Sequence, residues 1–336
     1  MPANRAPLTV ERYSPARKTD WDAFVAAGRN STFLFRRDYM DYHSDRFRDC
    51  SLMVFDGAAL IAVMPANDAG QGTVTSHGGL TYGGLVIGRE ATLMDVLASF
   101  QAILRWLHDN GHARLLFKQI PAFYNSLPDD EVDCALFQLD ARLYRRDCAI
   151  TVRLADRLPL QKRRQRSIKK AEKAGLRIVQ EATFDAFWDR VLVPRLAGRY
   201  GVKPVHSVQE ITLLASRFPD NIRLFAAYRG DEILAGTVIY ETPAVAHAQY
   251  IATTDAGQES GALDYLFQQL IDVQYRNKTW FDFGNCSEKD GRALNYGLLD
   301  WKEGFGGRCV AHDFYEIETV RHVKLEALIN PTPEKL

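Results

Sequence analysis

The stretch of sequence that decides the fold is Phe281-Asp282-Phe283-Gly284-Asn285-Cys286-Ser287. Residues 280–283 are mostly aromatic and alternate in character, which predicts a short buried strand. The strand runs directly into Gly-Asn-Cys-Ser, a composition typical of a loop. Polar side chains at the end of a buried strand lie where open α/β folds bind ligands, so we expect a binding site here. A plain solvated connection between a strand and a helix remains the alternative, because loops are generally polar.

The composition is that of a globular protein with a sizeable core. The chain has 336 residues, of which 46% are hydrophobic and 25% are charged, and this length favours two domains. Lys and Arg together number 42, as do Asp and Glu, so the formal net charge is zero. That balance argues against a dedicated nucleic-acid-binding protein. No apolar run approaches the roughly 18 residues of a membrane span, and residues 1–13 lack the apolar core of a secretion signal.

The cysteines are scattered along the chain and odd in number. No CxxC or Cys/His spacing indicates a zinc site, so we expect no metal. We interpret the cysteines as free thiols in a reducing cytoplasm. They are Cys50, Cys134, Cys148, Cys286 and Cys309.

The two halves of the chain show the same order of predicted elements: a helix, a hairpin, a third strand, a second helix and a further strand. The first half opens with Trp21-Asp22-Ala23-Phe24, and its hairpin turns at Asp56-Gly57. The second half opens with the similar Phe184-Asp185-Ala186-Phe187, and its hairpin turns at Arg229-Gly230-Asp231. The shared order predicts a structural duplication, although α/β chains share many element orders. The predicted segments are 21–25, 52–65, 73–87, 91–110 and 114–120, and then 184–188, 224–241, 246–253, 261–277 and 279–283.

A basic helix is predicted at residues 160–175, where the halves join, and it closes at Ala174-Gly175. Two interpretations of it remain open: a solvated linking helix, or a helix that faces phosphate anions. The tail, with Pro331 and Pro333, is expected to fray. The positive charges of the helix are Lys162, Arg163, Arg164, Arg166, Lys169, Lys170 and Lys173.

The order of elements in each half is similar to the GNAT acyltransferase fold. The resemblance implies an α/β (α+β) protein with tandem GNAT-like domains, each a mixed central sheet flanked by helices. It places an N-terminal domain on the acceptor side at 1–155, a C-terminal domain on the acyl-CoA side at 156–316, and a helix and tail at 317–336. In that fold the third strand diverges from its neighbour and exposes backbone groups to the pantetheine of acyl-CoA. The next helix points its N-terminus, with free N–H groups, at the pyrophosphate.

The same resemblance implies the residues that bind acyl-CoA in the second half. The strand positions are Tyr250, Ile251, Ala252 and Thr253, and the loop positions are Ser260, Gly261 and Ala262. The loop departs from the usual Q/R-x-x-G-x-G/A pattern, because no basic residue leads it and Glu259 would oppose a phosphate.

Over about residues 20–316 the chain more specifically resembles the Fem branch, whose members carry two GNAT-like domains. The matching segments are 120–124 with 129–131, 166–175 and 296–306. Peptidoglycan-bridge enzymes of this branch move amino acids from aminoacyl-tRNA to a muramyl peptide. Relatives in surface-polysaccharide pathways acylate nucleotide-linked amino sugars from acyl-CoA. Segments 75–84 and 203–206 look more like the sugar group.

Three residues are candidates for the chemistry. The resemblance places Lys302, after Trp301, at the reacting carbonyl, where it would stabilise the oxyanion or leaving group. Asp282, at a strand end, would accept the ammonium proton directly or through water. His206 can titrate near neutral pH. Each also has a plain interpretation: a solvated helix lysine, a strand-end carboxylate paired with a cation, and a structural histidine.

A nucleotide-sugar acceptor would need cations for its phosphates and aromatic or polar groups for its base and sugar. The substrate-binding candidates are Arg36, Tyr82, Arg199, Tyr200, Lys203, Asn285 and Trp301.

The sequence therefore predicts a cytoplasmic N-acyltransferase with acyl-CoA as co-substrate. It would acylate the amino group of a nucleotide-linked amino sugar in surface polysaccharide biosynthesis, with no membrane partner. The sequence does not fix the number of subunits. One alternative is an aminoacyl-tRNA-dependent Fem-type transferase acting on a peptidoglycan or peptide precursor. Another is a non-catalytic GNAT-like binding module.

Overall fold

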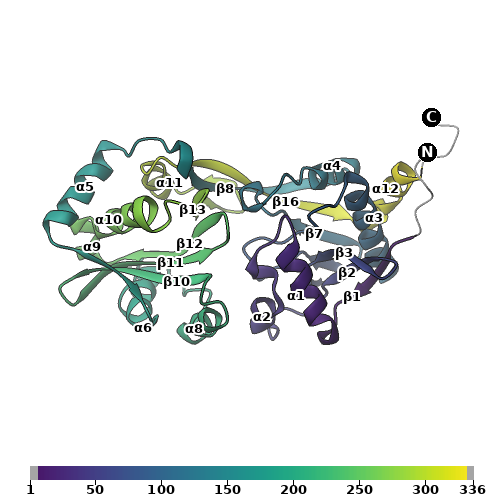
Figure 1. Cartoon of the computed structure of the whole chain (residues 1–336), viewed down its shortest axis with the longest axis horizontal. Helices are drawn as coiled ribbons and strands as arrows, with labels where there is room; N and C mark the ends of the chain where they lie inside the picture. The colour runs from purple at the N-terminus through teal and green to yellow at the C-terminus, as the bar shows by residue number, and fades with distance from the viewer. Residues whose placement is uncertain (1–6, 331–336) are drawn as a thin grey trace. The chain divides into compact units, whose positions relative to one another are not determined.

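A computed structural model describes residues 7–330 of the chain, which divides into two compact units (Figure 1). The first unit comprises Met1–Arg146 and His312–Leu336, and the second comprises Asp147–Ala311. Two strands carry the chain from one unit to the other: β8 (Arg142–Arg153) and β16 (Arg308–Glu318). The predicted boundaries lie at 155 and 316, whereas these units meet at Arg146–Asp147 and at Ala311–His312, and the described residues after Ala311 belong to the first unit. The predicted tail from residue 331 onward lies outside the described residues.

The first unit contains two groups of paired strands, in the orders β1-β2-β3-β6 and β4-β5-β7-β16. The predicted hairpin is confirmed: Val54 pairs with Ala62, and Gly57 takes the left-handed conformation with φ of +57°. The predicted third strand breaks into β5 and β6, and between them the backbone of Gly83 lies so close to Ser76 that a Cβ on Gly83 would be 1.4 Å from the Ser76 carbonyl oxygen. The strands are β1 (Thr9–Arg12), β2 (Leu52–Asp56), β3 (Ala59–Met64), β4 (Asn67–Gly70), β5 (Thr73–Thr75), β6 (Val86–Ile87) and β7 (Arg114–Lys118).

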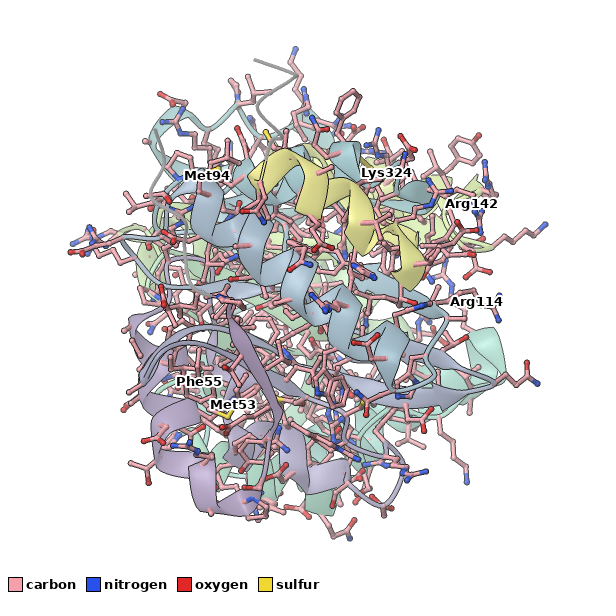
Figure 2. All side chains as sticks on the ribbon, turned by 90° about the vertical axis from the view of Figure 1, so that its right-hand side faces the viewer. Met53, Phe55, Met94, Arg114, Arg142 and Lys324 are labelled. Atoms are coloured by element: carbon pink, nitrogen blue, oxygen red, sulfur yellow. A yellow bond between two sulfur atoms is a disulfide. The ribbon has the colours of Figure 1, made fainter. Side chains whose placement is uncertain are left out.

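The core of the first unit lies under α3 (Leu93–Asp109), the predicted second helix of this half. A capping box formed by Thr92 and Asp95 starts this helix. The C-terminal helix α12 (His322–Ile329) lies beside α3 (Figure 2) and buries Leu325 in the same core. This packing keeps the end of the described chain with the first unit. The remaining helices are α1 (Lys18–Ala27), α2 (Arg37–Met40) and α4 (Glu131–Gln138).

The second unit contains a mixed sheet in the order β8-β13-β12-β11-β10-β9. One face carries α5 (Lys162–Lys173) and α10 (Ala262–Gln269), and the other carries α6 (Asp185–Phe187) and α8 (Val208–Arg217) (Figure 1). The predicted helix at 261–277 is α10 followed by a π-helical turn at Leu270–Gln274. The strands are β9 (Arg177–Glu181), β10 (Ile222–Arg229), β11 (Glu232–Glu241), β12 (Val245–Thr253) and β13 (Trp280–Asn285), and the other helices are α7 (Val193–Tyr200), α9 (Asp255–Ser260) and α11 (Tyr296–Glu303).

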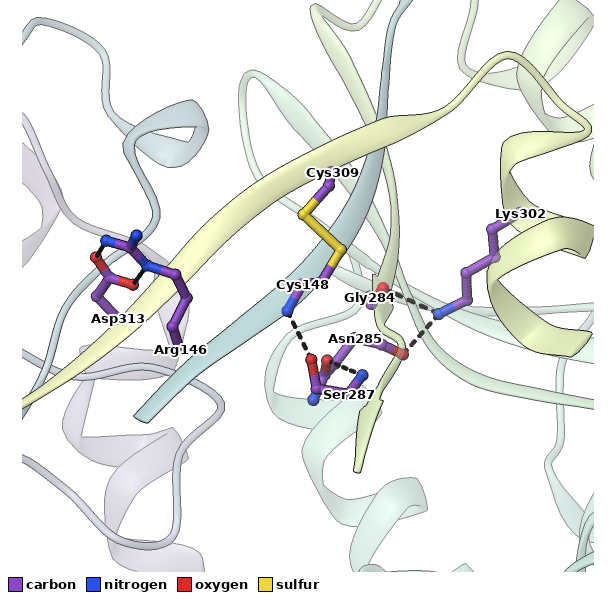
Figure 3. The surroundings of a disulfide bond; sticks show 8 residues. All are labelled: Arg146, Cys148, Gly284, Asn285, Ser287, Lys302, Cys309 and Asp313. Carbon is purple, nitrogen blue, oxygen red and sulfur yellow. Dashed lines mark hydrogen bonds and ion pairs between the residues drawn. A yellow bond between two sulfur atoms is a disulfide. The ribbon is translucent and has the colours of Figure 1, made fainter. Parts of the chain in front are cut away.

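The expectation that all cysteines are free is wrong for one pair. Cys148 of β8 and Cys309 of β16 form a disulfide, with Cα atoms 5.5 Å apart (Figure 3). The two residues are 161 positions apart in sequence, so only the pairing of their strands brings them together. Cys50, Cys134 and Cys286 are free.

Within residues 7–330, no helix has both the length and the apolar character needed to cross a membrane.

Candidate active site

The site is built where two neighbouring parallel strands of the second unit separate. β12 and β13 pair over three residue pairs, the last of which is His247 with Asp282. Beyond this pair, β13 stays paired with β8, through an irregularity that ends where Asn285 pairs with Ala149, while β12 continues along β11 to Thr253. A bulge at Gln249 adds an extra residue to β12 just after the separation point. The predicted divergence of the third strand from its neighbour is therefore present.

A hydrogen-bonded pair of ionisable side chains lies at the separation point. Nδ1 of His247 is 2.7 Å from Oδ2 of Asp282, and the Gly284 N–H donates to Oδ1 of the same carboxylate over 2.7 Å. Burial alone would raise the pKa of Asp282, but His247, this N–H and Lys302 outweigh burial, so the pKa lies below its usual value. The carboxylate is therefore ionised and holds the imidazole in a fixed orientation.

Lys302 of α11 is buried beside this pair, with 2% of its surface exposed. Its Nζ donates to the backbone carbonyls of Gly284 and Asn285 over 2.9 and 2.8 Å (Figure 3). Burial lowers the pKa of Lys302, and the nearby Cys286 thiol and Asp282 carboxylate act in the opposite direction. The interpretation of Lys302 as a solvated helix lysine is therefore wrong, because the sharp turn at Gly284 aims two carbonyls at the ammonium.

Two of the predicted substrate residues near Lys302 bond to other side chains of the second unit. The indole Nε1 of Trp301 donates to Asp264 over 2.8 Å, and its ring packs against the core phenylalanines. The Asn285 amide nitrogen donates to Asp147 over 3.0 Å, and its oxygen accepts the Ser287 N–H over 2.6 Å. Asn285 is nonetheless exposed to solvent.

His206 lies against one of the residues predicted to bind acyl-CoA. It is buried, and its Nδ1 is 2.6 Å from the hydroxyl of Tyr250 on β12. The His206 backbone N–H donates to the same hydroxyl over 3.1 Å, and its carbonyl accepts the Trp188 indole N–H over 3.2 Å. The segment between α7 and α8 is thus attached to the part of β12 that lacks a β13 partner.

The remaining predicted acyl-CoA residues follow along β12 and into the helices after it. Ala252 and Thr253 are buried, and Ile251 is half-buried. Ser260 ends the short helix α9, and Ala262 begins α10. The position between these two helices requires glycine. Gly261 has a φ of +79°, and a Cβ there would lie 2.5 Å from the carbonyl oxygen of Ser167 on α5.

The other predicted substrate residues are spread over both units. In the first unit Arg36 is exposed, whereas the Tyr82 ring is buried and its hydroxyl donates to Thr32 over 3.1 Å. In the second unit Arg199 and Lys203 are exposed. The side chain of Tyr200 lies outside the described residues.

His247 and Gln249 are the site residues that the sequence analysis missed. Nε2 of His247 is 3.2 Å from the Gln249 side-chain oxygen, so the two form a chain with Asp282. Two polar residues at alternate positions of an otherwise apolar strand were the available signal. Such a pattern is also typical of a half-solvated strand face, which is why it was not decisive.

No cluster of His, Cys, Asp or Glu that would suit a metal ion occurs in the described part of the chain.

Comparison with known proteins locates this site in a recognised domain. Residues 161–303 match the model of an acetyltransferase (GNAT) domain. No curated protein matches the sequence. The fold of the whole chain is similar to FemX, at 10% identity and a TM-score of 0.65, covering 94% of this chain and 99% of that one.

Two further solved structures are similar over nearly their whole length. One is the C-terminal domain of a putative lysylphosphatidylglycerol synthetase from Agrobacterium fabrum, with 12% identity, a TM-score of 0.59, and coverage of 94% and 97%. The other is a tandem GNAT protein from the clavulanic acid biosynthesis pathway, with 12% identity, a TM-score of 0.51, and coverage of 93% and 98%. The predicted α/β fold is confirmed, and the domain match supports the prediction of an acyltransferase.

Proposed function

We propose that this protein is an N-acyltransferase whose acyl donor binds in the second unit, where β12 and β13 separate. The observation that carries the proposal is the loss of pairing after His247 and Asp282. After His247, the edge of β12 that faces β13 has backbone N–H and C=O groups that β13 does not bond. The extended arm of a thioester donor can form hydrogen bonds with such groups, as an added strand would. The match of residues 161–303 to an acetyltransferase domain supports the same assignment.

The charges around the separation point suit acyl transfer to an amine. As the amine attacks, negative charge develops on the carbonyl oxygen, and a preorganised positive charge stabilises it. Lys302 supplies a buried ammonium there. The attacking amine must also give up a proton to a nearby acceptor, which the histidine–carboxylate pair provides.

For the substrates we propose acyl-CoA and a nucleotide-linked amino sugar, used in the cytoplasm in surface polysaccharide biosynthesis. Arg199 and Lys203 are exposed cations on either side of the turn that leads to His206 and Tyr250. Their charge suits the phosphates of an activated sugar.

A second candidate donor is aminoacyl-tRNA, which the similarity to FemX and to a lysylphosphatidylglycerol synthetase favours. The structure adds a cationic stripe on α5, composed of Lys162, Arg166, Lys169 and Lys173. These four residues are exposed, and their spacing of four, three and four places them on one helix face over about 16 Å. No ion pair involves them within the described residues, whereas Arg163, Arg164 and Lys170 bond to the protein.

The two donors are separated by one set of measurements on the full chain. If acyl-CoA is the donor, CoA should raise the melting temperature, because a ligand at a hundred times its Kd adds about 2.7 kcal/mol to stability. Acetyl-CoA should then support turnover with amino-sugar nucleotides, and this turnover should survive replacement of the whole cationic stripe by glutamine.

The opposite pattern supports the tRNA donor. In that case millimolar CoA leaves the melting temperature unchanged, aminoacyl-tRNA supports turnover, and activity falls steeply with salt. The stripe variant should then lose most of its activity and much of the salt dependence. Retained CoA binding without turnover on any acceptor would indicate a non-catalytic binding module.

A further inference from the structure

We propose that His247 accepts the proton of the attacking amine and that Asp282 positions it. This inference rests on the function proposed above and names the group that carries out one step of it. The amine nitrogen forms a bond to the acyl carbon, and the bond from that carbon to the leaving group breaks. The amine proton passes to Nε2 of His247. The imidazolium returns this proton to water, and the leaving group takes a proton from water in turn.

The position of His247 in the sheet is the first argument. His247 and Asp282 are the last paired residues before β12 and β13 separate, so they lie at the point of the gap. Ala246, Ala248 and Phe281 pack in the core with α10. Because side chains alternate along a strand, His247 and Asp282 point to the opposite face. Donor and proton acceptor can therefore meet at this point from different sides of the sheet.

The hydrogen bonds of the pair are the second argument. Both oxygens of Asp282 accept bonds, one from His247 and one from the Gly284 N–H. The carboxylate is buried and ionised, so it is a poor proton acceptor for an incoming amine. Instead it fixes the proton of a neutral His247 on Nδ1, which leaves the lone pair on Nε2. The expectation that Asp282 itself takes the proton gives way to a positioning role.

Gln249 suits both protonation states of the imidazole. Its side-chain oxygen is 3.2 Å from Nε2 and accepts a bond from the imidazolium. After a flip of the amide, its nitrogen donates to the lone pair of the neutral ring. Gln249 is half-buried, and 11% of the His247 side chain is exposed. The bulge in β12 gives this side chain its place next to His247.

The elements packed around His247 place the following charged and titratable groups near it. Asp282 of β13 stabilises the imidazolium, and Lys302 of α11 opposes it. Cys286 lies beside Lys302, and Tyr240 of β11 is the strand partner of His247. The π-helical turn at Trp188–Leu192 also packs on β12, and its charged residues are exposed.

The test compares His247→Gln and Asp282→Asn with the wild-type chain, using whichever of the two donors supports turnover. His108→Gln is the matched control, because His108 is an exposed histidine on α3 of the first unit. His247→Gln should lower kcat at least about a hundredfold, with little change in the KM for the donor, because a general base typically contributes that much. It should also abolish the loss of kcat/KM at acidic pH.

Asp282→Asn distinguishes catalysis from a merely structural role. Asp282→Asn removes the negative charge 2.7 Å from Nδ1 that favours the imidazolium, so the acidic limb of the kcat/KM profile should move to lower pH. Nitrogen NMR of labelled histidine gives a second readout: the proton of neutral His247 should lie on Nδ1, and this preference should weaken in Asp282→Asn.

Either of two results would overturn the assignment: His247→Gln retaining turnover within threefold of wild type, or an acidic limb that stays in place in Asp282→Asn. If neither donor supports turnover, the proposed function fails and the catalytic role of His247 fails with it. If the wild-type chain turns over and the Asp282→Asn variant keeps the acidic limb of the wild type, only the role of His247 is overturned.

Discussion

Replacing Lys302 by methionine tests whether the buried ammonium stabilises the fold as well as the reaction. Methionine fills a similar volume but donates no hydrogen bond, so the carbonyls of Gly284 and Asn285 lose their donor. Each hydrogen bond to a charged donor contributes about 1.5–3 kcal/mol. The methionine variant no longer buries a charge, and this gain offsets part of the cost. Removing one member of a buried ionic cluster typically destabilises by about 3–5 kcal/mol, so we expect a net loss of about 3 kcal/mol.

That loss translates into a measurable shift in melting temperature. For a unit of this size, 1 kcal/mol corresponds to about 2–4 °C, so the second unit should melt about 6–12 °C lower. The matched control is Lys169→Met on α5. Because Lys169 is exposed and forms no ion pair within the described residues, its replacement should change stability by less than about 0.5 kcal/mol. Scanning calorimetry of both variants gives the comparison.

The catalytic part of the prediction is measured well below the lower melting temperature. If the ammonium stabilises charge that develops only in the transition state, Lys302→Met should lower kcat about a hundredfold while leaving substrate affinities nearly intact. Near-normal turnover in an assay limited by chemistry would refute the catalytic role. A stability within 0.5 kcal/mol of wild type would refute the energetic role of the two hydrogen bonds.

Three other predictions concern groups outside this cluster. Arg164→Leu should destabilise by about 3–5 kcal/mol, because Nη1 of Arg164 lies 2.8 Å from both oxygens of the buried Asp264, and chemical denaturation should show part of this loss restored when Asp264→Leu is added. Burial raises the pKa of Asp129 to about 6, so its contribution to stability is full below about pH 4 and is lost as pH rises through 6. Asp129→Asn should therefore gain up to about 3 kcal/mol over wild type at pH 7.5 and little at pH 4 in urea unfolding; an equal difference at both pH values would contradict this. Thiol titration of the unfolded chain should find three free cysteines before reduction and five after it, and five without reductant would exclude the bond between Cys148 and Cys309.

The sequence by itself determined the local elements and their order. Alternating apolar and polar residues predict strands, apolar residues at helical spacing predict helices such as α3, and Asp56-Gly57 predicts a tight turn. These predictions succeed because each pattern depends on residues that are close together in the chain. The duplicated order and the strand that ends in Asp282 followed from the same signals. Together with the resemblance that this order carries, they led to the prediction of a GNAT-like fold and to Asp282 and Lys302 as predicted site residues.

Only the tertiary structure decided which side chains meet. His247 lies 35 positions before its partner Asp282, and their contact depends on the register of two parallel strands, which no local pattern encodes. The burial of Lys302 depends on the turn at Gly284 aiming carbonyls at it. The disulfide depends on pairing of strands 161 positions apart. Contacts between distant residues are fixed by packing and pairing over the whole fold, and a single sequence records them only as isolated polar residues.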